Sequence, residues 1–191
     1  DYPAVTRLAP DPSAVVASTF MAEVRPLILI PSYNTGPILE RTAASVLALK
    51  TPVWVIIDGS TDGSVDLISP LENPEFRIIR LPVNSGKGAA ILHGLREAMS
   101  AGFTHVLAMD ADGQHPADWV GRFFELSAAH PEAAVFGRPV FDASAPALRV
   151  EGRKISNFWA NLETLGWGID DSLFGMRLYP AQALLDVMES T

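Results

Sequence analysis

Short apolar runs alternate with helical patterns along most of the chain, and this alternation limits the folds it can adopt. Each run is followed directly by proline, aspartate or glycine, as buried strands often are. The stretches between them carry apolar residues at the spacing of one helix face. The alternation predicts an α/β fold, with a Rossmann-like, mostly parallel sheet and helices on both faces. The expected strands are 27–30, 53–57, 77–81, 105–109 and 133–136, and the expected helices are 37–49, 64–71, 88–101 and 119–129.

The pattern is less regular at the two ends of the chain. Residues 1–24 contain prolines and small residues, and we interpret them as an N-terminal arm. Residues 25–191 are expected to form a single domain. Its last part is expected to contain a long loop, a helix, a strand and a final helix, at residues 137–150, 153–165, 173–179 and 181–188.

Composition excludes several classes of protein. The chain has 191 residues, enough for a sizeable core, and its formal net charge of −8 argues against nucleic acid as a main partner. It has no cysteine, which excludes disulfides and thiolate zinc sites and fits a reducing compartment. No apolar stretch reaches the roughly 18 residues of a membrane-spanning helix. We therefore expect a cytoplasmic protein without a transmembrane segment, and a peripheral position at the inner membrane face remains open.

Polar clusters follow four of the expected strands. They are residues 31–36, 58–64, 84–88 and 110–116. Parallel strands end at the same edge of a sheet, and ligands of such sheets bind at the carboxyl ends of the strands. We therefore expect the four clusters to gather along one rim.

Asp110-Ala111-Asp112 is the cluster with the clearest chemistry. If the strand persists that far, Asp110 and Asp112 point to the same side, and two carboxylates beside a glycine loop suit a hard divalent cation. The same pattern also occurs by chance in surface turns. Gln114 could supply a third oxygen ligand, whereas His115 is expected to lie in a surface turn before a proline.

The first two clusters combine groups that bind ligands with groups that make turns. Pro31-Ser32-Tyr33-Asn34 could hold a base or sugar, but serine and asparagine also cap helices. Asp58, at the tip of the second strand, could accept hydrogen bonds from a nucleobase N–H or from ribose hydroxyls. Asp62 is expected to cap the next helix, with Gly63 in the turn.

The segment Asn84-Ser-Gly-Lys-Gly88 resembles a phosphate loop without matching either common motif. A Walker motif would need glycine at Leu81 and serine or threonine at Gly88, and a dinucleotide fingerprint would need glycine at Ile91. The segment can still place backbone amides, Lys87 and a helix N-terminus beside an anion. A simple turn is the alternative.

Taken together, these motifs resemble the family 2 glycosyltransferases, which have the GT-A fold. The matching segments are Ile30–Asn34, Ile57–Ser64, Asn84–Gly88 and Met109–Pro116, in the expected order and spacing. Residues 110–116, together with Asp171-Ser-Leu-Phe-Gly-Met-Arg-Leu-Tyr179, resemble the branch that contains dolichyl-phosphate mannose synthase and the polyprenyl-phosphate glycosyltransferases.

The resemblance implies an enzyme that moves a sugar from a nucleoside-diphosphate sugar to an acceptor and inverts the anomeric centre. It implies an Mg²⁺ or Mn²⁺ ion that bridges the diphosphate. The residues it assigns to the metal are Asp110, Asp112 and Gln114. Around the nucleotide sugar it places Pro31, Tyr33, Asp58, Lys87, Asp110 and Ala111.

On the acceptor side, the resemblance makes residues 115–191 the acceptor-binding half of the GT-A catalytic domain. Asp112 and Asp171 are expected to take part in catalysis, and Asp171 is the first candidate for a general base if the acceptor is a hydroxyl, with Asp170 as the alternative. If the acceptor is a lipid phosphate at the membrane surface, it is largely ionised already, and arginines matter more. The candidate arginines are Arg138, Arg153 and Arg177.

Two features depart from the family pattern. Members usually have two consecutive acids where this chain has Ile57-Asp58. Members also commonly continue further, so acceptor-side elements are expected to be truncated here. Two other functions therefore remain: a catalytically silent sugar-nucleotide-binding module, and a sugar-nucleotide pyrophosphorylase. A pyrophosphorylase would normally have a glycine-rich loop after its first strand, which residues 31–36 do not provide.

Overall fold

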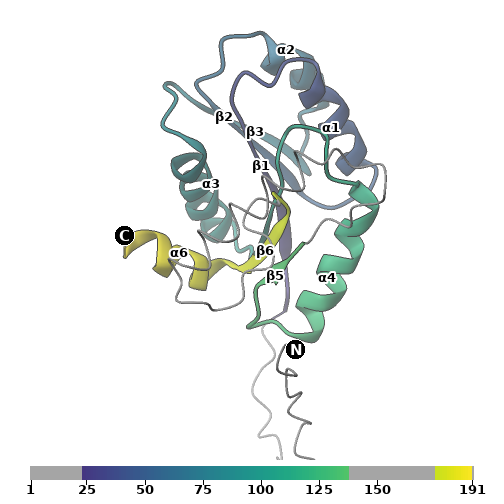
Figure 1. The fold of residues 1–191 in the computed structure, drawn as a ribbon, viewed down its shortest axis with the longest axis vertical. Helices are drawn as coiled ribbons and strands as arrows, with labels where there is room; N and C mark the ends of the chain where they lie inside the picture. Colours follow the sequence, from purple (N-terminus) through teal and green to yellow (C-terminus); the bar gives the residue numbers. More distant parts are fainter. Residues whose placement is uncertain (1–22, 138–174, 191) are drawn as a thin grey trace, which may run out of the picture.

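The protein has a six-stranded sheet between two layers of helices (Figure 1). The computed structural model describes residues 23–137 and 175–190. The strand order is β3-β2-β1-β4-β6-β5, in which β3, β2, β1 and β4 are mutually parallel and β6 runs antiparallel to both of its neighbours. The α/β, mostly parallel fold expected from the sequence is therefore confirmed. The strands are β1 (Pro26–Ser32), β2 (Val53–Asp58), β3 (Phe76–Leu81), β4 (His105–Ala108), β5 (Val135–Phe136) and β6 (Arg177–Pro180).

The helices divide between the two faces of the sheet. Figure 1 shows α3 and α6 on one side and α1, α2 and α4 on the other. Two apolar clusters match this division, because strand residues alternate between the faces. Ile28 and Ile30 belong to the first cluster, and Leu27 and Leu29 to the second. The helices are α1 (Ile38–Leu47), α2 (Ser64–Ile68), η1 (Ser69–Leu71), α3 (Lys87–Ser100), η2 (Ala117–Trp119), α4 (Val120–Ala129) and α6 (Ala181–Glu189).

Helix α3 packs on the sheet through a face of mostly small residues. Its buried positions are Ala90, Gly94, Leu95 and Ala98. A methyl group on Gly94 would lie 2.6 Å from Leu29 Cδ1, so the helix backbone lies directly against the strand side chains. Leu95 is the one large side chain among these four, while Ile91 and Met99 are partly buried and pack against the same apolar cluster. Large apolar side chains flank the contact, and small ones form it.

Strand β1 continues through Pro31, where the sequence pattern predicted that it would stop. Leu29 O accepts a hydrogen bond from Met109 N at 3.0 Å, so the odd-numbered residues of β1 direct their backbone groups toward β4. Strand β4 ends at Ala108, and its pairing with β1 ends at Leu29. Pro31 therefore has no strand on that side to receive an N–H, and the missing donor costs no ladder hydrogen bond.

The last strand begins later than expected and ends one residue further on. Residues 173–179 were expected to form it, whereas the structure has β6 at Arg177–Pro180, inserted antiparallel between β4 and β5. Gly175 and Met176 lead into it without strand pairing. The insertion brings the start of β6 beside the end of β4, with Arg177 paired to Ala108.

Several expected elements lie outside the described residues. They are the N-terminal arm up to residue 22, all but the first residue of the loop at 137–150, and the helix at 153–165. The division of the chain into an arm and one domain stays a prediction.

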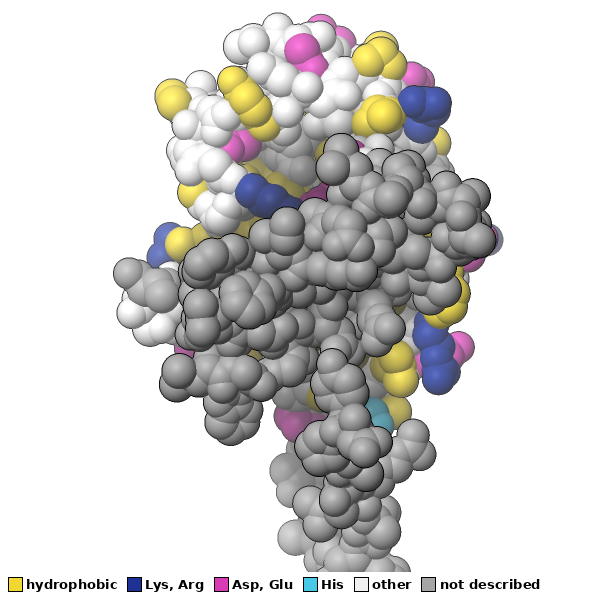
Figure 2. Space-filling view, in the orientation of Figure 1, with side chains coloured by type: hydrophobic (Ala, Val, Ile, Leu, Met, Phe, Trp, Pro, Cys, Tyr) yellow, Lys and Arg dark blue, Asp and Glu magenta, His cyan; other side chains and the backbone are white. Residues whose placement is uncertain are grey.

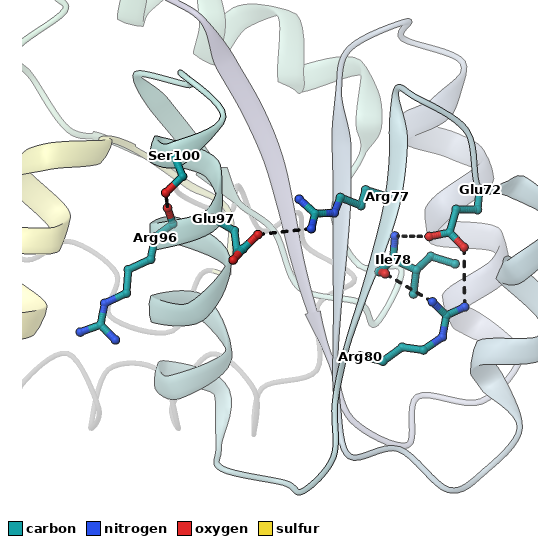
Figure 3. Close-up of polar contacts among 7 residues, drawn as sticks. All are labelled: Glu72, Arg77, Ile78, Arg80, Arg96, Glu97 and Ser100. Atoms are coloured by element: carbon teal, nitrogen blue, oxygen red, sulfur yellow. Dashed lines mark hydrogen bonds and ion pairs between the residues drawn. The ribbon is translucent and has the colours of Figure 1, made fainter.

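Charged side chains close the outer edge of β3 (Figure 3). Glu72 Oε1 accepts a hydrogen bond from Ile78 N at 3.2 Å, and Arg80 donates to Ile78 O at 3.3 Å. Arg77 forms an ion pair with Glu97 of α3 at 3.2 Å. Because Ile78 already has partners for both backbone groups, the edge strand is protected against pairing with another chain.

The described surface on the face drawn in Figure 2 carries Lys and Arg side chains that are spread out rather than gathered into one patch. Within residues 23–137 and 175–190, no helix is both long enough and apolar enough to span a bilayer.

Gly59, directly after β2, lies against the loop that follows β3. It has φ +68°, and a methyl group there would lie 2.7 Å from the backbone carbon of Val83. Gly63 has a similar φ of +75° but faces open space. Substitution of Gly63 would therefore add only left-handed strain, whereas substitution of Gly59 would add both that strain and a clash with backbone atoms.

We predict that Gly59→Ala lowers the free energy of unfolding by about 3 kcal/mol, from left-handed strain plus overpacking against backbone. Gly63→Ala is the matched control, with an expected loss of about 1 kcal/mol from the conformation alone. Urea unfolding of both variants measures the difference. Equal losses would show that the approach of the two loops is not tight.

Candidate active site

A cleft of about 330 Å³ opens at the carboxyl ends of β1 and β2 and at the start of α3. The polar clusters after β1, β2 and β3 contribute to it, and the cluster after β4 joins through Lys87 and Asp110, so the expected convergence at one rim is observed. Tyr33 is 51% exposed beside the cleft and offers an aromatic face to a ligand. The cleft is lined by Pro31, Ser32, Tyr33, Asp58, Asn84, Gly86, Lys87 and Ala90, which include four of the residues expected around a nucleotide sugar.

Asp58 is buried and holds the loop before α3. Its Oδ1 accepts a hydrogen bond from Ser85 N at 2.9 Å, and its Oδ2 accepts one from Gly86 N at 2.8 Å. Buried carboxylates require such donors, and backbone N–H groups satisfy them well. Asp58 thus has a structural task that the sequence did not reveal, in addition to its position in the cleft.

The loops after β1 and β2 are joined by reciprocal hydrogen bonds. Asn34 N donates to Ser60 Oγ at 3.0 Å, and Thr61 N donates to Asn34 Oδ1 at 2.8 Å. Asp62 accepts hydrogen bonds from Gly36 N at 2.7 Å and from the Ser64 hydroxyl at 2.6 Å. The bond from the Ser64 side chain is the largest influence on the pKa of Asp62, which lies below its ordinary value of 3.8.

Asp110 lies between the side chains of Lys87 and His115, which come from separate segments. Lys87 Nζ forms an ion pair and hydrogen bond with Asp110 Oδ1, and His115 Nε2 lies 3.8 Å from Oδ2. Burial raises the pKa of Asp110, but the hydrogen bonds from His115 and Lys87 and the charge of Lys87 outweigh it, so the pKa is lowered overall. His115 lies in a turn as expected, but its side chain is only 6% exposed and is therefore not at the surface.

Asp112 and its neighbours form an exposed turn, because β4 ends at Ala108 and does not continue to Asp110 as the sequence argument required. Asp112 Oδ1 accepts a hydrogen bond from Gln114 N at 2.9 Å. Ala111 is buried, and its carbonyl accepts a hydrogen bond from Thr42 Oγ1 of α1 at 3.2 Å. The turn is thus fixed to α1 while Asp112 and Gln114 face solvent.

The donors in this turn fit a hard divalent cation. Asp110, Asp112 and Gln114 offer carboxylate and amide oxygens, and Asp112 is exposed. In the part of the chain that the structure describes, no three His, Cys, Asp or Glu side chains form a ready-made metal cluster. This is compatible with Mg²⁺, which is commonly held by one or two carboxylates together with substrate phosphates.

The expected acceptor residues are only partly described. Arg177 begins β6 beside Ala108, and its guanidinium lies 5.7 Å from the centre of the Phe136 ring. Arg177 therefore lies at the same rim as residues 110–114, the acidic turn after β4. Arg138, Arg153, Asp170 and Asp171 lie outside the described residues.

Gly175 is a site residue that sequence reasoning missed. A methyl group built on it would overlap the carboxylate of Asp110, with Oδ1 at 2.8 Å. The signal was present, because Gly175 lies within the motif 171–179, but its partner lies 65 positions earlier in the chain.

Fold and rim together define an α/β domain of the GT-A type. The known structure of residues 1–349 of TarS from S. aureus supports this, with a TM-score of 0.54 and 16% sequence identity over 85% of this chain and 49% of that one. The model described as "Glycosyl transferase family 2" matches residues 27–187. The chain therefore belongs to glycosyl transferase family 2, as its motifs predicted.

Two relatives match most of the chain. A polyprenol monophosphomannose synthase of Mycolicibacterium smegmatis is 28% identical over 175 residues, covering 85% of this chain and 66% of the relative. An undecaprenyl-phosphate mannosyltransferase of Micrococcus luteus is 27% identical over 187 residues, covering 87% and 72%. The chain thus spans 66% to 72% of the length of these relatives. Both names fall in the branch that the sequence motifs indicated.

Asp62 provides a test of the joined loops. We expect Asp62→Ala to lower the free energy of unfolding by about 1 kcal/mol at pH 7, because it removes charged hydrogen bonds at an exposed position. The pKa of Asp62 is lower in the folded protein, so its contribution is present above 3.8 and is lost as the pH falls through the folded value. The difference from wild type should therefore shrink as the pH falls below 3.8.

Urea unfolding at several pH values measures this effect, with Asp66→Ala, at an exposed acid on the following helix α2, as the control for loss of a negative charge. A difference that is constant over this pH range would contradict the role of the ionised carboxylate.

Proposed function

We propose that this protein transfers a sugar from a nucleoside-diphosphate sugar to a polyprenyl phosphate, with inversion at the anomeric carbon and with Mg²⁺ or Mn²⁺ bound. The observation that carries the proposal is the continuous polar rim, in which the cleft beside Tyr33 and Asp58 meets the acidic turn through Lys87 and Asp110. Family membership and the names of the two relatives support the same chemistry. The sugar suggested by the relatives is mannose.

The donor would bind along this rim. Tyr33 and Pro31 would contact the base, and Asp58 the base or ribose, from the first two loops of the cleft. The first turn of α3 would face the diphosphate, because the N–H groups at a helix N-terminus and the helix dipole favour an anion there. Lys87 and Ala111 lie where the diphosphate and the sugar would meet the acidic turn.

Asp110, Asp112 and Gln114 would hold the metal, which when bound neutralises the negative charge that develops on the leaving diphosphate. Asp110 is already paired with Lys87. When metal and diphosphate arrive, Lys87 is expected to move from the carboxylate to the phosphate oxygens. Before the ligands bind, the pairing with Lys87 keeps Asp110 ionised and in position.

The acceptor would approach the anomeric carbon from the face opposite the leaving group. A lipid phosphate has a second pKa of about 6 and is largely dianionic at neutral pH, so it needs no strong base. Arg177, at the rim, is proposed to bind such a phosphate, and Arg138 and Arg153 are proposed to assist it. For a hydroxyl acceptor, Asp171 or Asp170 would act as the base. We propose that the reaction takes place at the inner, cytoplasmic face of a membrane, because a lipid acceptor is membrane-bound.

The direct test is a thermal-shift series with GDP- and UDP-linked sugars, with and without Mn²⁺, followed by transfer of labelled sugar to polyprenyl phosphate. Bound ligand raises the melting temperature by mass action. Metal-dependent binding followed by transfer is the expected result. Binding without transfer would favour the silent module, and pyrophosphate-dependent cleavage of the donor would favour a pyrophosphorylase. No binding of any nucleotide sugar would refute the proposal.

Asp112 tests the metal site. We expect Asp112→Asn to weaken Mn²⁺-dependent donor binding at least about tenfold, roughly 1.4 kcal/mol, because a neutral amide is a poorer ligand for a hard cation. Isothermal titration calorimetry with and without Mn²⁺ measures this. Asp118→Asn, an exposed acid six residues away, is the matched control and should bind normally. Unchanged affinity in the Asp112 variant would exclude it as a ligand.

Lys87 should affect metal and donor in opposite directions. Lys87→Met removes the cation that competes at Asp110, so affinity for Mn²⁺ alone should rise severalfold, while donor affinity should fall about tenfold because a phosphate contact is lost. Lys50→Met, at an exposed lysine after α1, controls for the change in net charge. A variant that binds both ligands less tightly would contradict the exchange of partners.

A further inference from the structure

Gly175 lies against the carboxylate of Asp110. An ideal Cβ placed on it has Asp110 Oδ2, Cγ and Oδ1 as its three nearest atoms, and the distance to Oδ1 is 2.8 Å. Packed proteins do not tolerate contacts this short. The observed orientation of Asp110 therefore requires glycine at this position.

The backbone at Gly175 cannot easily retreat from Asp110. The next residue, Met176, is 1% exposed and belongs to the main apolar cluster, and its carbonyl accepts a hydrogen bond from Gly137 N at 3.1 Å. Strand β6 begins one residue later and pairs with β4 on one side and β5 on the other. A side chain at 175 would therefore displace the short side chain of Asp110, rather than the strand.

Backbone conformation does not explain the glycine. Gly175 is not among the described glycines with a left-handed φ, so left-handed strain is not the reason for glycine at this position. The requirement comes from the space that Asp110 occupies. Lys87 and His115 contact the same carboxylate from its other sides.

We propose that Gly175 is a positioning residue for Asp110. Its lack of a side chain leaves room for the carboxylate between Lys87, His115 and the backbone before β6. This contact sets the direction in which Asp110 presents its oxygens to a divalent cation and a diphosphate. The last statement rests on the proposed function, whereas the packing of Gly175 on Asp110 does not.

A double-mutant cycle on thermal stability tests the contact. Gly175→Ala should lower the melting temperature by about 3 °C or more in the wild-type background. In the Asp110→Ala background the carboxylate is gone, so the same substitution should leave the melting temperature unchanged within about 1 °C. Gly121→Ala, whose Cβ meets no atom within 4 Å, is the control and should behave alike in both backgrounds.

Each outcome of the cycle decides the question. A larger loss in the wild-type background supports the proposal, and so does a Gly175→Ala protein that fails to fold but is rescued by Asp110→Ala. Equal effects in the two backgrounds, including no effect in either, would overturn it, because a purely backbone role of the glycine does not depend on Asp110.

A binding measurement tests whether the packing of Gly175 on Asp110 also affects the binding of metal and nucleotide. The probe is Mn²⁺ with GDP or UDP, titrated calorimetrically into wild type and Gly175→Ala. At least about tenfold weaker metal-dependent binding is expected in the variant. Unchanged binding would remove the link to the ligands even if the stability cycle succeeds. If wild type itself binds neither metal nor nucleotide, the proposed function fails, and the stability cycle alone still decides the role of Gly175.

Discussion

The candidate site depends on the buried carboxylate of Asp58, which binds the loop before α3 through the amides of Ser85 and Gly86. This loop leads directly into Lys87, so its position fixes where the lysine can reach. Lys87 in turn pairs with Asp110 at the end of β4. The carboxylate of Asp58, at the end of β2, therefore helps to position the lysine that pairs with Asp110 after β4. Gly175 completes the arrangement, because it leaves the space that Asp110 fills.

This arrangement explains how an acidic protein, with a formal net charge of −8, can present a rim suited to an anion. The charge of Asp58 is compensated by hydrogen bonds from backbone amides, and that of Asp110 by its ion pair with Lys87. The N-terminus of α3 adds the favourable end of a helix dipole. Asp112 is the exposed acid of the turn. A cation bound there would offset its negative charge, which would otherwise repel a diphosphate.

Local sequence patterns predicted most strands and helices, because burial and periodicity act over a few residues. They did not predict that β1 continues through Pro31, since that depends on β4 having already ended beside it. They did not show that α3 packs through Ala90, Gly94, Leu95 and Ala98, since the close contact at Gly94 depends on Leu29 of a distant strand. The antiparallel insertion of β6 was also missed, because strand order is set by contacts between distant segments.

The sequence by itself determined the fold class, the family and the four polar clusters that meet at one rim, because parallel strands of a buried sheet end at the same edge. Only the tertiary structure decided the partners within that rim. Asp58 with the amides before α3, Lys87 with Asp110, and Asp110 with Gly175 are contacts between residues 23 or more positions apart. Residue types show which charges are available, but an ion pair or a close packing contact exists only where the folded chain brings the two atoms together.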